Sequence, residues 1–106
     1  MKHIKKTKMT PEAKLKKKVT AVLKARGAYY FTPVTGGFGT SGVPDIVVCY
    51  KGKFIGIECK HGDNKATALQ LKHLDDITKQ GGIAFVVRET TLDLLEIYLN
   101  KIEGEE

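Results

Sequence analysis

Apolar residues along this chain recur first at helical spacing and then in short strand-like runs, and these changes of spacing mark the expected elements. A helix is predicted from Pro11 to Arg26, because Thr10 suits its N-cap and Gly27 suits its end. Its apolar residues fall on one face, which consists of Leu15, Val19, Val22 and Leu23. Strands are expected at residues 28–32, 45–50, 53–59 and 83–87, and further helices at 68–79 and 90–103. The order α-β-β-β-α-β-α predicts a single-domain α/β fold in which helices flank a small mixed sheet.

The stretch GVPDIVVCYKGKFIGIECK, residues 42–60, places charged side chains inside or at the edge of apolar strands. Asp45, Glu58 and Lys60 are unusual there, because strand interiors disfavour charged residues. A buried charge is also unfavourable unless it is paired or bound to a metal. These three residues are therefore candidates for chemistry.

The loop between the two strands decides whether the charges meet. If Lys51-Gly52 is a two-residue hairpin loop, Asp45 falls directly opposite Glu58, and Lys60 points to the same face. A three-residue loop would shift the register by one residue and separate the carboxylates. The same alternation points Cys59 into the core.

Two adjacent carboxylates repel each other unless a cation lies between them, and such oxygen ligands suit Mg²⁺ or Mn²⁺. With an ammonium group beside them, they would form a metal-dependent site for phosphodiester hydrolysis. The alternative is a buried ion pair between Lys60 and either carboxylate, with a structural role only.

The net charge of +6 is concentrated at one end of the 106 residues. Residues 1–26 contain ten Lys and Arg against one acidic residue, whereas residues 27–106 contain eight against eleven. This block suits a polyanion such as DNA, with residues 1–9 as a flexible basic arm. A solvated helix face with a disordered tail is the alternative. The block lacks large aromatic residues, which disfavours a membrane surface.

Composition predicts an ordinary globular protein, with 42% hydrophobic residues and no apolar run of the roughly 20 residues that a membrane span needs. No signal peptide is expected, so the predicted location is the cytoplasm of a bacterial or phage-infected cell, or its nucleoid. Cysteines are normally reduced there, and Cys49 and Cys59 are expected to be buried as small hydrophobic residues. Tyr29, Tyr30 and Phe31 are expected in the strand core.

The motifs in this order resemble the PD-(D/E)XK nuclease superfamily. Pro44-Asp45, twelve intervening residues and Glu58-Cys59-Lys60 match its signature, and GGFGTSGVPD is similar to the glycine-rich loop before the catalytic aspartate. Glu12 lies in the first helix, where Holliday-junction-resolvase-like members carry an acidic residue. Gln70 opens the next helix, as in the VRR-NUC (virus-type replication-repair nuclease) subfamily. The resemblance covers roughly residues 10–90 and extends to the expected domain, residues 10–103.

The resemblance implies a role for each matching residue. Asp45 and Glu58 would be the main metal ligands, with the backbone carbonyl of Cys59 completing the set, and Lys60 would position or activate the water. Glu12 would bind or orient the metal through water.

Gln70 would steady Lys60 or the substrate phosphate. For both Gln70 and Glu12, a purely structural role is the alternative. Gln70 forms a T-x-x-Q capping box with Thr67, and Glu12 suits the dipole at the start of its helix.

The function implied is that of a Mg²⁺- or Mn²⁺-dependent DNA endonuclease, selective for branched DNA such as Holliday junctions and active as a homodimer. The expected DNA contacts are Lys14, Lys17, Lys18, Gly36, Gly37 and Phe38, the last as a wedge into branched DNA. Alternatives are a nonspecific or flap/nick nuclease, a nucleic-acid-binding module, and a subunit that is active only with a partner such as a helicase.

Overall fold

The computed structural model describes residues 9–34 and 39–104 of this chain. Its elements are α1 (Pro11–Ala25), β1 (Tyr29–Phe31), β2 (Ile46–Tyr50), β3 (Lys53–Cys59), α2 (Ala68–Lys79), β4 (Ile83–Val87), the 3₁₀ turn η1 (Glu89–Thr91) and α3 (Asp93–Gly104). The predicted order and the α/β class are confirmed. No helix in the described ranges is long and apolar enough to cross a membrane.

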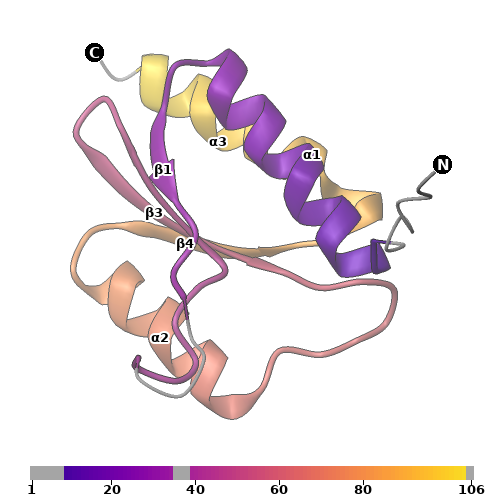
Figure 1. The fold of residues 1–106 in the computed structure, drawn as a ribbon. Helices are drawn as coiled ribbons and strands as arrows, with labels where there is room; N and C mark the ends of the chain where they lie inside the picture. The colour runs from indigo at the N-terminus through magenta and orange to yellow at the C-terminus, as the bar shows by residue number, and fades with distance from the viewer. Residues whose placement is uncertain (1–8, 35–38, 105–106) are drawn as a thin grey trace, which may run out of the picture.

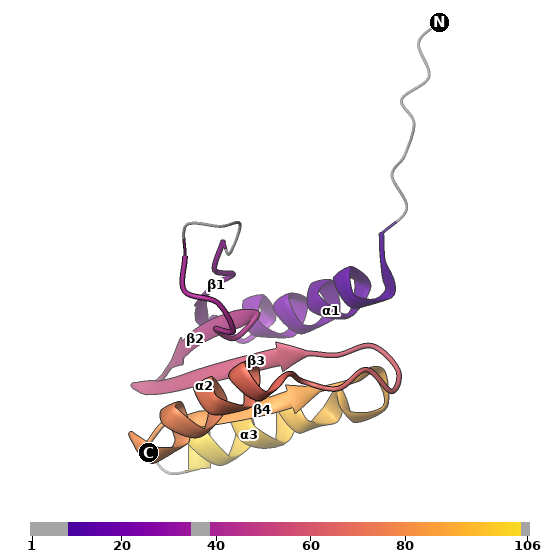
Figure 2. The ribbon, with the colours of Figure 1, turned by 90° about the horizontal axis from the view of Figure 1, so that it is seen from below.

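The four strands form one mixed sheet in the order β1-β2-β3-β4, with β1 at one edge (Figure 2). The first two pairings are antiparallel, and β3 pairs with β4 in parallel. A parallel pair needs a long crossover, and here the crossover contains α2. Figure 1 shows α1 and α3 on one face of the sheet and α2 on the other.

The hairpin turn has the predicted two residues. Lys51 has a φ of 50° and Gly52 a φ of 82°, as a two-residue type I′ turn requires. The register runs from Tyr50 opposite Lys53 to Ile46 opposite Ile57. The predicted register is therefore confirmed, and the next positions outward are those of the two candidate carboxylates.

The core lies between the sheet and the helices α1 and α3. Alternate side chains of β2, β3 and β4 contribute to it, together with the apolar faces of both helices. The fully buried residues among them include Leu15, Val19, Leu23, Ile46, Ile55, Ile57, Leu95 and Leu99. Arg26 links the two helices, because its guanidinium donates to Glu96 at 2.9 Å and to Asn100 at 2.8 Å. The result is a closed layer that holds α1 in a fixed position over the sheet.

The opposite face is only partly covered, and three predictions of burial are wrong for this reason. Cys49 is exposed, and so are Tyr29 at 69% and Phe31 at 48%. Helix α2 packs on β3 and β4, so it leaves the β1–β2 half of this face open. Tyr30 points the other way and packs partly against the core, and Cys59 is fully buried as predicted.

Gly56 lets α2 lie close to the sheet. A Cβ at this position would lie 2.6 Å from Ile77 Cδ1 and 3.0 Å from Pro44 Cγ. We therefore expect Gly56→Ala to lower the free energy of unfolding by ~1–3 kcal/mol, which is typical of an overpacked core. Urea unfolding followed by circular dichroism measures this loss.

Two further variants serve as controls. Ile77→Val removes the Cδ1 atom, so the double variant should recover part of the stability. At Gly104 a Cβ would meet nothing within 4 Å, and Gly104→Ala should lose no stability. A Gly56→Ala protein as stable as the wild type would contradict the close packing.

Candidate active site

The structure brings Asp45, Glu58 and Lys60 together at one end of the β2–β3 hairpin. Asp45 directly precedes β2, Glu58 is the penultimate residue of β3, and Lys60 directly follows it. The backbone N–H of Lys60 donates to the carbonyl of Val87 at 3.0 Å, which continues the parallel pairing with β4. Lys60 Nζ lies 3.3 Å from Glu58 Oε2. The predicted grouping is therefore present.

Glu58 is the only buried polar or charged side chain among the described residues, with 1% of its surface exposed. Its Oε1 atom is buried without a hydrogen-bond partner in the described part of the chain. Burial and the nearby charge of Asp45 raise the pKa of this carboxyl from 4.5 to about 7, although Lys60 opposes the shift. The positive charge of Lys60 alone is therefore too little to balance the buried Glu58 carboxylate.

Asp45 is held in place by two contacts. Its Oδ2 accepts a hydrogen bond from the backbone N–H of Cys59 at 2.8 Å. Its Oδ1 lies 3.5 Å from Nζ of Lys16, a residue of α1. Lys16 was not predicted as a site residue. Its spacing was a usable signal, because it follows Glu12 by four residues and so lies on the same helix face.

Cys59 contributes its backbone to the site and its side chain to the core. The thiol is fully buried, and burial, together with the charge of Asp45, raises its pKa to about 12. A thiol in this state does not ionise at neutral pH, so it is neither a nucleophile nor a metal ligand.

Glu12 lies near the site but not within its carboxylate pair. It is half-buried in the first turn of α1, and its charge contributes to the raised pKa of Cys59. Within residues 9–34 and 39–104, no three His, Cys, Asp or Glu side chains form a group that could hold a metal. Glu12 is thus not brought into one cluster with Asp45 and Glu58.

Gln70 forms the capping box that was its structural alternative. Its Oε1 accepts from the Thr67 N–H at 2.9 Å, and its own N–H donates to Thr67 Oγ1 at 3.1 Å, so the capping box is present. Gln70 also lines a cavity of about 400 Å³ with Asp45 and Lys16. The other lining residues are Thr32, Pro33, Ser41, Gly42, Val43 and Pro44.

The expected DNA contacts divide into two groups. Lys14, Lys17 and Lys18 are exposed on α1, where they border a shallow hollow on the helix surface. Gly36, Gly37 and Phe38 lie outside the described residues.

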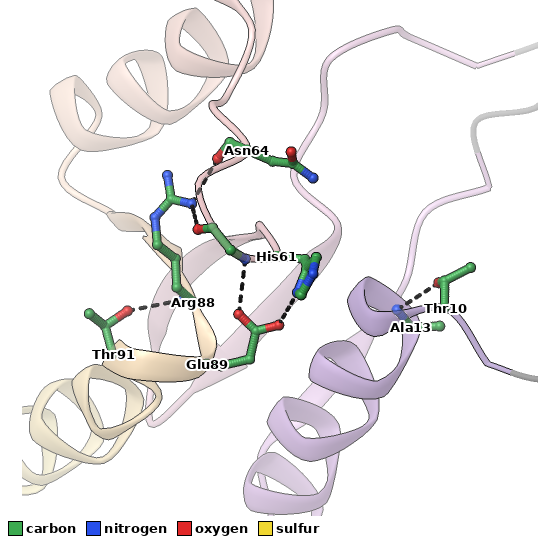
Figure 3. Close-up of polar contacts among 8 residues, drawn as sticks. Thr10, Ala13, His61, Asn64, Arg88, Glu89 and Thr91 are labelled. Atoms are coloured by element: carbon green, nitrogen blue, oxygen red, sulfur yellow. Dashed lines mark hydrogen bonds and ion pairs between the residues drawn. The ribbon is translucent and has the colours of Figure 1, made fainter.

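A second polar network holds the loop that follows Lys60. Glu89 accepts from His61 Nδ1 at 2.6 Å and from the Gly62 N–H at 3.1 Å (Figure 3). Arg88 donates to the carbonyls of Gly62 and Asn64, each at 2.7 Å. We call this network the β4 clamp. It ties the segment after Lys60 to the end of β4, and thus limits movement of the site lysine.

The donor set at the hairpin end fits a divalent cation. Two carboxylates lie side by side, and one of them has a buried oxygen that lacks a partner within residues 9–34 and 39–104. Hard oxygen donors are the ligands that Mg²⁺ and Mn²⁺ prefer. Asp45, Glu58 and the carbonyl of Cys59 are the groups that could hold the ion.

No family model matches the sequence, and no curated protein is similar to it in sequence. Solved structures with a similar fold do exist. One, a VRR_NUC domain, has a TM-score of 0.66 and 22% identity over 91% of this chain and 94% of its own. A VRR_NUC domain protein has a TM-score of 0.63 and 18% identity over 92% of this chain and 89% of its own.

A third similar structure is Hjc, a Holliday junction resolvase from the archaeal hyperthermophile Archaeoglobus fulgidus. Its TM-score is 0.55 at 19% identity, and the match covers 72% of this chain and 65% of Hjc. Identities this low show a shared fold. The fold implied by the resemblance of the motifs is therefore confirmed.

Glu58→Gln is expected to stabilise the metal-free protein at high pH. The raised pKa of Glu58 means that the folded chain binds this proton more tightly than the unfolded chain does. Wild-type stability therefore falls as the pH rises from 4.5 towards about 7. In EDTA, the variant should exceed the wild type by ~2–3 kcal/mol at pH 8 and by much less at pH 5. Thermal and urea unfolding at both pH values measure this difference.

Added Mg²⁺ or Mn²⁺ should then raise the melting temperature of the wild type and leave that of Glu58→Gln unchanged. Asp75→Asn, which alters an exposed pair with Lys79, is the control and should show neither effect. A wild type that is more stable than Glu58→Gln at pH 8 without metal would identify Glu58 as part of a structural ion pair.

The β4 clamp should hold at mildly acidic pH. The hydrogen bond from His61 is the main cause that lowers the pKa of Glu89 from 4.5 to about 2, and backbone N–H groups add to it. A lowered pKa stabilises the folded chain above pH 4.5, and this stabilisation is lost as the pH falls towards 2. Carboxyl carbon shifts in NMR should show Glu89 titrating near the lower value, and His61→Ala should move the pKa towards 4.5. Titration of wild-type Glu89 near 4.5 would rule out the clamp in solution.

Proposed function

We propose that this chain is a Mg²⁺- or Mn²⁺-dependent DNA endonuclease that hydrolyses phosphodiester bonds in branched DNA, such as four-way junctions, as a homodimer. The observation that carries the proposal is the buried Glu58 carboxylate, which has Asp45 and Lys60 beside it and one oxygen without a hydrogen-bond partner among the described residues. The similar fold of a Holliday junction resolvase supports the choice of substrate.

A divalent cation at this site would supply charge neutralisation at the phosphate and lower the pKa of a water molecule. Asp45, Glu58 and the carbonyl of Cys59 would hold the cation, and Glu12 would contribute through water. The hydrogen bond from the Cys59 N–H fixes one Asp45 oxygen and leaves the other directed towards Lys16. The chain thus orients its carboxylates before any ligand arrives.

Lys60 would act on the phosphate or on the attacking water. Its side chain is 13% exposed and is already oriented by Glu58. An ammonium group held in a water-poor environment stabilises developing negative charge better than a mobile one. The β4 clamp ties the residues that follow Lys60 to the end of β4.

Lys16 would bind the DNA phosphate next to the cleaved bond. It now lies near Asp45, but a cation on that carboxylate would repel it because both are positive. Lys14, Lys17 and Lys18 on the same helix, with the basic arm, would hold the backbone at neighbouring phosphates. Gly36, Gly37 and Phe38 remain proposed DNA contacts. The cap uses the amide oxygen of Gln70, and its amide nitrogen would suit a phosphate oxygen.

Cleavage of a labelled four-way junction and a matched linear duplex tests the proposal. Wild-type protein should make paired cuts in the junction with Mg²⁺ or Mn²⁺ and none in EDTA. Lys60→Ala should lower the rate by ~10²-fold or more, as loss of one charge-stabilising donor does. Lys79→Ala changes an exposed lysine that pairs with Asp75 on α2, and it should cleave like the wild type.

Other outcomes separate the alternatives. Equal metal-dependent cutting of both substrates would indicate a nonspecific nuclease, and cutting at flaps or nicks would indicate that specificity instead. Junction binding without cleavage under any metal condition would overturn the enzymatic proposal. Cleavage that appears only on addition of a helicase would indicate a partner-dependent subunit.

A further inference from the structure

Helix α1 brings the ammonium group of Lys16 to the candidate site. The neighbours of Lys16 on the helix, Leu15 and Val19, are fully buried in the core, so its backbone is fixed over the sheet. Its Nζ lies 3.5 Å from Oδ1 of Asp45, which is longer than the 2.8 Å of the two lysine–aspartate pairs on α2. This separation exceeds the usual length of a hydrogen bond. Charge therefore holds the Lys16 side chain at the site, and its ammonium group can turn to another anion.

The two carboxylates of the site have one lysine each. Lys60 Nζ lies 3.3 Å from Oε2 of Glu58, and Lys16 faces Oδ1 of Asp45. The other oxygen of Asp45 accepts the Cys59 N–H at 2.8 Å. Oε1 of Glu58 is buried without a hydrogen-bond partner in the part of the chain that the structure describes. Three of the four carboxylate oxygens are thus already faced by a donor, and the fourth is the one that most needs a cation.

The carboxylates that meet here are too few for two metal ions. Two-metal sites hold their ions ~3.5–4 Å apart, so several carboxylates must bridge and flank the pair. Residues 9–34 and 39–104 contain no group of three His, Cys, Asp or Glu side chains that could hold a metal. Mg²⁺ needs only one or two carboxylates, because waters and phosphate oxygens complete its coordination. The donor set of Asp45 and Glu58 therefore suits one ion.

The balance of charge also favours one ion. Lys16 and Lys60 cancel the charges of the two carboxylates, so these four groups have no net charge. A phosphodiester attacked by hydroxide carries two negative charges, which one divalent cation matches. A second divalent cation would leave two positive charges unbalanced in a partly buried site, which is unfavourable. An ammonium group can stabilise the charge that develops on a phosphate without adding this excess.

We propose that Lys16 supplies the positive charge that a second metal ion supplies in two-metal nucleases, so that this chain binds a single divalent cation. A cation held by Asp45 and Glu58 repels the ammonium group of Lys16. Lys16 then turns to a phosphate in the cavity that it lines together with Asp45. The contact with phosphate rests on the proposed function, whereas the limit of one ion rests on the donor set and the charges.

Binding of Mn²⁺ in the absence of DNA tests the number of ions and the opposing charge. Titration followed by the electron paramagnetic resonance signal of free Mn²⁺ should show one ion per wild-type chain. Lys16→Met keeps the apolar stem and removes the charge. It should bind the ion ~10-fold more tightly, because the repulsion from a partly exposed ammonium group is lost.

Lys24→Met is the matched control for this titration. Lys24 lies in the last turn of α1, eight residues after Lys16 and thus about 12 Å further along the helix. The variant loses the same charge from the same helix, but at physiological salt that distance exceeds the screening length. It should therefore bind Mn²⁺ like the wild type. Circular dichroism checks that each variant folds.

Cleavage of the four-way junction at saturating Mn²⁺ tests the contact with phosphate. Lys16→Met should cleave ~10-fold or more slowly than the wild type, although it binds the metal more tightly. Lys16→Arg should recover most of the rate, because it restores the positive charge. A lysine with only a structural role would not give this combination, since its loss would loosen the site and weaken metal binding as well.

The outcomes separate this inference from the proposed function. Two Mn²⁺ ions per wild-type chain, or binding that is unchanged or weaker in Lys16→Met, overturns the inference even if junction cleavage is observed. Cleavage by Lys16→Met at the wild-type rate also overturns it. One ion per chain and tighter binding in Lys16→Met, without cleavage of any DNA, supports the charge role of Lys16 and overturns the function. A wild type that binds no Mn²⁺ overturns both.

Discussion

The two-residue turn at Lys51-Gly52 is the constraint on which the candidate site depends. Its positive φ angles close the hairpin in the register that pairs Ile46 with Ile57. Because side chains alternate along a strand, this register directs apolar residues to α1 and α3 and brings Asp45 next to Glu58. A slip of one residue would therefore have two effects: it would expose the core side chains, and it would separate the two carboxylates. The stability of the core therefore maintains the geometry of the site.

The buried Glu58 carboxylate lowers the stability of the fold. A domain of this size has only ~5–15 kcal/mol of net stability, so a buried carboxylate with a raised pKa is a considerable burden. In a structural ion pair, both oxygens would be satisfied. Here Lys60 lies near Oε2, and Oε1 has no partner in the described part of the chain. The arrangement is thus incomplete as a structural ion pair.

Sequence reasoning succeeded where local rules decide the outcome and failed where packing between distant segments decides it. The turn residues predicted the register, and the register predicted the meeting of Asp45 and Glu58. The exposure of Cys49 could not be predicted from local sequence rules, because it depends on how much of the sheet α2 covers. Arg88 and its partner carbonyl at Asn64 are 24 residues apart, and no local pattern links them.

The two faces of the sheet differ in how completely helices cover them. The face under α1 and α3 is closed, and α1 carries the exposed lysines on its outer side. The face on the side of α2 is half open and apolar. Lys16 connects the two, because it extends from α1 to Asp45 at the end of the hairpin. A polyanion attracted to the lysines of α1 would thus lie close to the candidate site.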